Sequence, residues 1–74
     1  MDIRRLVGRN LKEIREEQGL SQEDLAYEAG IHRTYVSGVE RGVRNPTVVV
    51  LARLADALGV PPARLVKETK SEKR

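Results

Sequence analysis

The stretch GIHRTYVSGVERGVRNPT, residues 30–47, decides how this chain folds. It contains three arginines, three glycines and the only histidine, although it lies in the middle, where a small domain needs its core. Val36 and Val39 recur at helical spacing, so a helix over residues 33–41 would bury both valines on one face. The outward face would then carry Arg33, Thr34, Ser37 and Gly38. We therefore predict that this polar face serves binding and not the core.

Local signals predict two helices before this stretch. Ser21 is a favourable N-cap because acidic residues follow it in the first turn, and Gly30 ends this second helix after two turns. An earlier helix ends before Gly19. Its apolar residues recur at three- and four-residue spacing, and they are Ile3, Leu6, Val7, Leu11 and Ile14.

Two more helices are predicted after it. Thr47 is the N-cap of a helix over residues 48–58, whose inward residues are Leu51, Leu54, Ala55 and Leu58. The β-branched run at residues 48–50 could instead form a strand, but the cap, the later periodicity and Gly59 favour a helix. Pro61 and Pro62 open a short helix through Val66, with proline at its first helical position. The predicted fold is all-α, with one domain over residues 1–66 and a charged, disordered tail over residues 67–74.

Composition excludes several classes of function. The 74 residues include 34% charged and 3% aromatic residues and no cysteine, so the core is aliphatic and no disulfide or thiol chemistry is available. No apolar run is long enough to span a bilayer or to act as a secretion signal, so we expect a cytoplasmic protein without a membrane partner. No catalytic motif or metal-ligand spacing is present, and His32 is expected to cap a helix. The chain is predicted not to be an enzyme and to need no cofactor or metal.

Charge is distributed in blocks along the chain. Residues 13–28 carry six acidic residues and one basic residue, whereas residues 29–53 carry four basic residues and one acidic residue. Residues 1–12 are also basic, with four basic residues and one acidic residue. A face of one sign can attract a charged partner even though the formal net charge is only +3.

Helix, glycine-containing turn and helix form the pattern of a helix-turn-helix, whose second helix enters the major groove of DNA. From Leu6 to Val66 the chain resembles the Cro/CI repressor type of helix-turn-helix protein, the XRE family. The segment QEDLAYEAGIHRTYVSGVERGVRN is most similar to the controller proteins of restriction–modification systems. The resemblance implies a five-helix, lambda-repressor-like domain that regulates transcription, binds palindromic operators as a homodimer and controls its own gene.

The resemblance also implies which residues contact DNA. They are Gln22 at the start of the second helix, Arg33, Thr34, Tyr35, Ser37 and Gly38 in the third, and Arg44 and Asn45 in the loop after it. Arginine in the first turn of the recognition helix can donate two hydrogen bonds to guanine, and threonine can touch a thymine methyl or a phosphate. Each of these residues could instead be an ordinary surface or capping residue.

Gly38 departs from phage repressors, which commonly place a base-contacting side chain at this position. Glycine in a helix interior lowers helix stability, so either close approach to DNA or a tight helix crossing must explain it. For Arg15 and Glu40 the family pattern implies a structural role. They are expected to form a partly buried ion pair that holds the third helix against the first.

The resemblance also implies a dimer interface on the last two helices, opposite the recognition helix. The apolar residues left over there are Val49, Val60, Leu65 and Val66, and an exposed apolar patch usually marks an interaction site. The alternative is that the fifth helix folds back and buries Leu65 and its neighbours as core.

Two other functions are compatible with the same fold. The first is a protein-interaction module, an antitoxin or antiactivator that masks a partner protein, and the second is nonspecific coating of DNA. RNA polymerase is a further candidate partner of a regulator, whereas no small-molecule ligand is expected because the chain has no room for a sensing domain. Whether the protein activates or represses is not encoded in any of these patterns.

Overall fold

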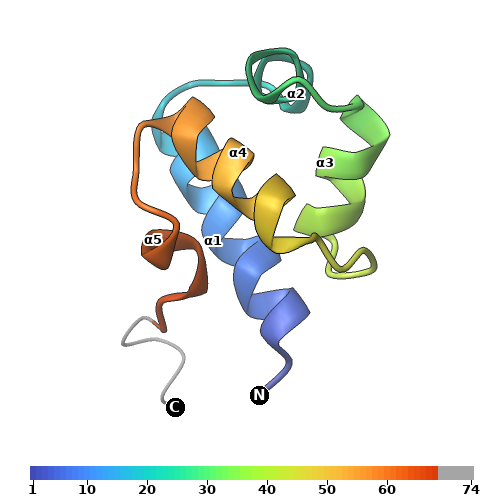
Figure 1. The fold of residues 1–74 in the computed structure, drawn as a ribbon, viewed down its shortest axis with the longest axis vertical. Coiled ribbons are helices and arrows are strands. Elements are labelled where there is room, and N and C mark those ends of the chain that lie inside the picture. Colours follow the sequence, from blue (N-terminus) through green and yellow to red (C-terminus); the bar gives the residue numbers. More distant parts are fainter. Residues whose placement is uncertain (69–74) are drawn as a thin grey trace.

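The computed structural model describes residues 1–68 of the chain, and this part contains five α-helices and no strand. The helices are α1 (Ile3–Glu17), α2 (Gln22–Ala29), α3 (Arg33–Glu40), α4 (Val48–Leu58) and α5 (Ala63–Val66) (Figure 1). The predicted all-α fold is thereby confirmed, and residues 48–50 are helical. No helix in the described part is long and apolar enough to cross a membrane.

Helix ends form where the local sequence signals place them. Ser21 accepts a hydrogen bond from the Asp24 amide at 2.9 Å, and the Asp24 carboxylate accepts one from the Ser21 amide at 3.2 Å. This capping box satisfies backbone donors that the first turn of α2 leaves free. Thr47 caps α4 in a similar way through the amide of Val50. One detail of the prediction is wrong, because Pro62 is the N-cap of α5 and not its first helical residue.

The core is built from one face of each helix. Buried apolar side chains come from all five helices, and the largest fully buried ones are Leu11, Leu25, Leu54, Leu65, Val36 and Val39. The placement of Leu65 corrects the expectation that it belongs to an exposed dimer patch. Helix α5 folds back against α1, so the Leu65 side chain is 0% exposed within the monomer.

The Asn10 side chain joins α1 to α5 by hydrogen bonds. Asn10 is 4% exposed, and its amide nitrogen donates to the carbonyl oxygens of Leu65 and Lys67, each at 2.9 Å. Two unpaired carbonyls at the end of a short helix are thus satisfied by one buried side chain. The expected disordered tail begins at Lys67, whose carbonyl takes part in this contact, and residues 69–74 of that tail lie outside the described residues.

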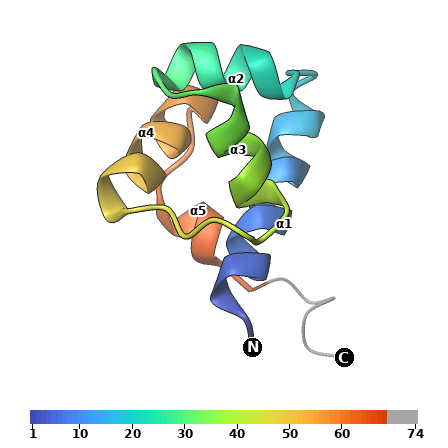
Figure 2. The same cartoon turned by 90° about the vertical axis from the view of Figure 1, so that its right-hand side faces the viewer.

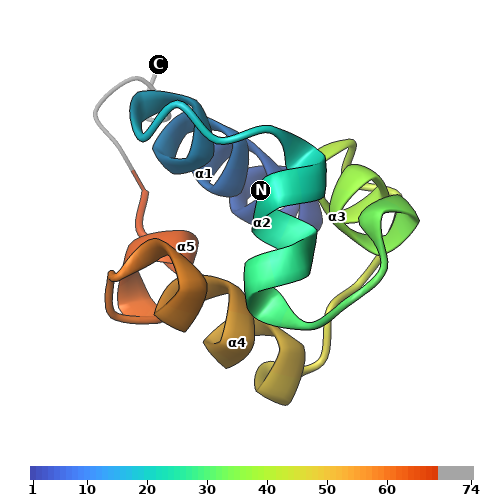
Figure 3. The same cartoon turned by 90° about the horizontal axis from the view of Figure 1, so that it is seen from above.

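Helices α1 and α3 cross closely at Gly8. A Cβ atom at this position would lie 2.4 Å from the carbonyl oxygen of Val39 and 2.6 Å from that of Glu40. Both obstacles are backbone atoms of α3, so they cannot rotate away as a flexible side chain could. Gly8 therefore sets how near α3 comes to α1. Viewed from above, α3 lies across the molecule from α5 (Figure 3).

Candidate nucleic-acid interface

Helices α2 and α3 pack together and are joined by a three-residue turn, residues 30–32. Gly30 adopts a left-handed backbone with φ of 70°, which favours glycine and reverses the chain direction. His32 then caps α3, because its Nδ1 accepts a hydrogen bond from the Thr34 amide at 3.3 Å. Figure 2 shows α3 facing the viewer, with α2 across its upper end. This arrangement is a helix-turn-helix.

Helix α3 has a buried face and an exposed face. Val36 and Val39 are both 0% exposed, and they hold the helix against the core. Arg33 and Thr34 in the first turn are exposed, and Ser37 one turn later is half-buried. Among the described residues no carboxylate forms an ion pair with Arg33. The first turn therefore presents an exposed guanidinium, and beside it the Thr34 hydroxyl, which lies 2.9 Å from His32 Nδ1 and takes part in the cap.

Gly38 lies elsewhere than expected. The prediction that it belongs to the outward face is wrong, because the loop after α3 folds back over it and leaves it buried. The Gly38 carbonyl accepts hydrogen bonds from the amides of Val43 and Arg44 at 3.0 and 3.1 Å. A Cβ atom on Gly38 would lie 3.1 Å from the Arg44 Cβ. The expected alternative of a tight helix crossing is not what the structure shows, because the neighbour that lies against Gly38 is the loop residue Arg44.

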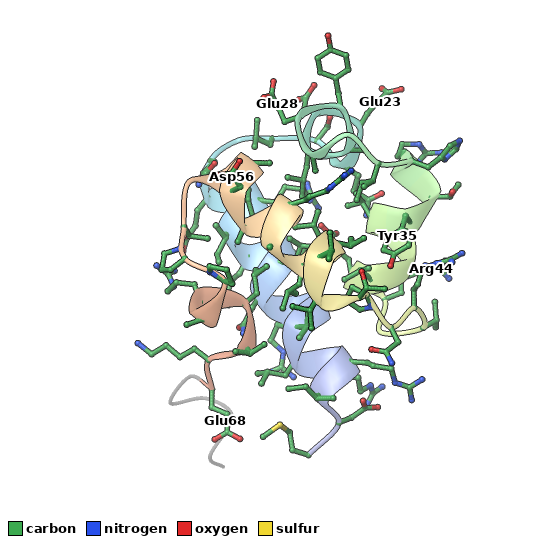
Figure 4. All side chains as sticks on the ribbon, in the orientation of Figure 1. Glu23, Glu28, Tyr35, Arg44, Asp56 and Glu68 are labelled. Atoms are coloured by element: carbon green, nitrogen blue, oxygen red, sulfur yellow. The ribbon has the colours of Figure 1, made fainter. Side chains whose placement is uncertain are left out.

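Arg44 and Tyr35 lie together beside this glycine. The Arg44 guanidinium carbon is 5.0 Å from the centroid of the Tyr35 ring, within the range of a cation–π contact. The tyrosine is half-buried and packs against the core, whereas Arg44 and the following Asn45 are exposed. Figure 4 shows the labelled side chains of Tyr35 and Arg44 at the same edge of the molecule, beside α3.

Three residues from three helices form a hydrogen-bonded network behind α3. Arg15 donates to the two carboxylate oxygens of Glu40 at 2.6 and 3.0 Å, and to the carbonyl of Leu20 at 2.7 Å. Gln22 donates to Glu40 at 3.0 Å. The hydrogen bonds to Glu40 raise the pKa of the Arg15 guanidinium above its ordinary value, against the opposing effect of burial. The network joins the end of α1, the start of α2 and the end of α3.

Basic side chains gather where α1 meets the end of α3. A concave surface next to the end of α3 is lined by Arg5, Arg9, Lys12, Arg41 and Glu40. Glu40 is the one acid of this lining, and it is already paired with Arg15. Labelled carboxylates such as Asp56 and Glu68 lie away from Tyr35 and Arg44 in Figure 4. A surface of this sign attracts a polyanion.

Sequence reasoning did not single out three residues to which the structure gives a role, Gly8, Asn10 and Arg41. Gly8 and Asn10 fall within the periodic pattern of the first helix and were not singled out, although glycine inside a helix is a signal of close packing. Arg41, the C-cap of α3, lines the basic concave surface and was not assigned a role. Within the described residues no cluster of His, Asp or Glu is arranged to hold a metal ion.

The exposed first turn of α3, the buried scaffold behind it and the basic surround define a helix-turn-helix DNA-binding domain. The Helix-turn-helix family model matches residues 11–65. The HTH-type transcriptional regulator y4dJ of Sinorhizobium fredii is 49% identical over 69 residues, which is 93% of this chain and 90% of that protein. Control protein C.BamHI of Bacillus amyloliquefaciens is 42% identical over 69 residues, covering 92% of this chain and 85% of its own.

Solved structures agree with these relatives. The crystal structure of the restriction–modification controller protein C.AhdI from Aeromonas hydrophila matches with a TM-score of 0.82 and 47% identity, covering 84% of this chain and 94% of that one. The chain therefore belongs to the Cro/CI (XRE) type of the helix-turn-helix family and has the lambda-repressor-like fold. It is a DNA-binding transcriptional regulator and not an enzyme.

Proposed function

We propose that this regulator binds palindromic operators as a homodimer and controls its own transcription. The observation that carries the proposal is the first turn of α3, where Arg33 and Thr34 are exposed while Val36 and Val39 fix the opposite face in the core. In this arrangement the arginine can donate to guanine O6 and N7, and the threonine can contact a neighbouring thymine or phosphate. The remaining candidate DNA contacts are Arg44, Asn45, Ser37, Tyr35 and Gln22, and the Gln22 amide also donates to Glu40 at the end of α3.

A dimer is supported by the size of the domain and by its apolar surface. One chain presents one recognition helix, whereas a palindrome needs two helices about 34 Å apart. Val49 is 65% exposed and Val66 is 42% exposed. Val66 lines a groove together with four apolar residues, Ile3, Val7, Pro46 and Leu51, and with Arg4 and Asn45 at its polar part. A second copy that covers α4 and α5 would bury this surface, as isologous dimers do. Leu65 drops out of that interface because it is core.

Regulation at a promoter also implies a location in the cell and a protein partner. A protein that occupies operator DNA works in the cytoplasm, where the chromosome lies, and it meets RNA polymerase at the promoter. Its relatives C.BamHI and C.SmaI are named control proteins, which supports a role in controlling a small set of genes, its own among them.

Selection from a random pool of duplex DNA, followed by footprinting upstream of the chain's own gene, tests specificity. Arg33→Ala should weaken binding to the selected duplex by about 1–3 kcal/mol and relax preference at one base pair in each half-site. Arg44→Ala should weaken all duplexes more evenly and lower the salt slope by about one unit. Unchanged affinity of Arg33→Ala at fixed salt would show that α3 does not contact the bases.

Sedimentation at micromolar concentration tests the dimer. Val66→Asp should give a folded monomer that loses cooperative operator binding, because the charge falls on the half-exposed surface of α5. A wild-type protein that stays monomeric both on and off DNA would refute this assembly. A stoichiometric partner protein in a pull-down, together with no sequence preference for DNA, would instead favour an antitoxin or antiactivator.

A further inference from the structure

The Arg44 side chain lies against Gly38, which has no side chain of its own. The Arg44 side chain lies against α3 at this glycine, because a Cβ atom there would lie 3.1 Å from Arg44 Cβ, 3.4 Å from Nε and 3.9 Å from Cδ. A larger side chain at position 38 would therefore compete with these three Arg44 atoms for the same space. Glycine in a helix interior lowers helix stability relative to alanine, so this position needs a compensating role.

The far end of Arg44 is also held in place. Its guanidinium carbon lies 5.0 Å from the Tyr35 ring centroid, and the ring itself packs against the core. Tyr35 and Gly38 are three residues apart and share a side of α3. Arg44 therefore runs from the loop along α3 toward the first turn, where Arg33 and Thr34 are exposed.

The near end is anchored by backbone. The amides of Val43 and Arg44 both donate to the Gly38 carbonyl, at 3.0 and 3.1 Å. Among the described residues Arg44 forms no ion pair, so its position is set by the glycine, the tyrosine ring and these two hydrogen bonds. A loop arginine would otherwise sample many rotamers and would lose that freedom on binding.

We propose that Gly38 is a positioning residue for DNA recognition. It lets Arg44 lie along α3 with its guanidinium over the Tyr35 ring, so that a loop arginine is presented to DNA as part of the recognition helix. Gly38 itself does not need to touch DNA. This inference rests on the proposed function only in assuming that Arg44 contacts DNA; the placement of the arginine can be tested without DNA.

A double-mutant cycle separates this role from the alternatives. The variants are Gly38→Leu, Arg44→Ala and their combination, with Gly38→Ala as the small step, and the probes are a duplex selected by the wild-type protein and a shuffled duplex of equal composition. Arg44→Ala should weaken binding to the selected duplex about tenfold, the loss of one charge-assisted contact. Gly38→Leu should weaken binding to the selected duplex by a similar factor. Gly38→Ala should weaken it less, because Arg44 needs to move by only a few tenths of an ångström to make room for a methyl group.

The combined variant decides the mechanism. If Gly38 acts through Arg44, the double variant binds within about twofold of Arg44→Ala alone, because the arginine is already gone. If Gly38 instead faced the DNA, adding Gly38→Leu to Arg44→Ala would weaken binding to the selected duplex about tenfold again. That result would overturn the proposal. Wild-type affinity of Gly38→Leu would overturn it as well.

A measurement without DNA tests the placement directly. The δ-methylene protons of Arg44 should show a ring-current shift from Tyr35 in the nuclear magnetic resonance spectrum of the free wild-type protein. The shift should vanish in Gly38→Leu and in Tyr35→Leu. Unshifted Arg44 signals in the wild-type protein would refute the stacked placement, even if no operator had been found.

Folding of the variants is part of the same test. Gly38→Leu that folds only when Arg44 is alanine would support the steric conflict between the two side chains. Gly38→Leu that unfolds in both backgrounds would show that the glycine serves packing unrelated to Arg44, and the proposal would be wrong.

Discussion

Glu40→Gln should destabilise the domain strongly, although it replaces only one carboxylate oxygen by an amide nitrogen. The Glu40 side chain is 3% exposed and that of Arg15 is 9% exposed, and the carboxylate receives two hydrogen bonds from Arg15 and one from Gln22. An amide nitrogen at one of those oxygens would face an arginine donor, so the buried cation would lose its counter-charge. Breaking a buried pair by removing one partner costs about 3–5 kcal/mol.

The lower end of that range is the better estimate here. Arg15 keeps its hydrogen bond to the Leu20 carbonyl at 2.7 Å and a weak ion pair with Glu16 at 3.8 Å. In a domain of this size about 1 kcal/mol shifts the thermal midpoint by about 4–8 °C. We therefore expect Glu40→Gln to lower the midpoint by about 12–24 °C in thermal unfolding followed by circular dichroism.

Matched variants make the experiment specific. Glu16→Gln removes the exposed partner of the same arginine and should cost less than about 1 kcal/mol. Replacing both Arg15 and Glu40 by methionine should recover much of the stability, because no buried charge remains. DNA binding by Glu40→Gln should weaken only through disorder of α3 and release of Gln22. A Glu40→Gln protein with the wild-type midpoint would refute the account of the ion pair.

Two further predictions concern how α1 holds its neighbours. Gly8→Ala should lower the midpoint and displace α3, because the new methyl group would meet the carbonyl oxygens of Val39 and Glu40 at 2.4 and 2.6 Å; thermal unfolding checks the first effect, and a midpoint at or above that of the wild type would contradict it. Asn10→Ala should leave two carbonyls at α5 without their donor and cost about 1–3 kcal/mol. Amide exchange should then speed up in α5 before α2, and unchanged exchange in α5 would argue against the anchor.

How much of this protein could be foreseen depends on the range of the interactions involved. Ser21, Gly30 and Thr47 mark helix ends through hydrogen bonds and backbone angles within a few residues, so they could be identified in the sequence alone. The same holds for the exposed first turn of α3, because helical periodicity separates Arg33 and Thr34 from Val36 and Val39. The Arg15–Glu40 pair joins residues 25 apart, and only resemblance to a family pointed to it.

Tertiary structure decided the roles of residues whose partners are distant in sequence. Asn10 meets the carbonyl of Leu65 across 55 residues, and no local pattern shows that α5 turns back onto α1. The same fold-back converts Leu65 from a candidate interface residue into core. Gly38 is equally ambiguous in sequence, because a missing side chain can admit DNA, another helix or a loop.

Sequence by itself therefore determined the five helices, the caps at Ser21, His32 and Thr47, and the exposure of Arg33 and Thr34, since each follows from contacts along one helix. The crossing of α1 and α3 at Gly8, the burial of Gly38 under Arg44 and the burial of Leu65 were decided only when the helices packed. The physical reason is that close packing depends on which surfaces meet and at what distance. A helix carries its own periodicity, but it does not record the surface that will lie against it.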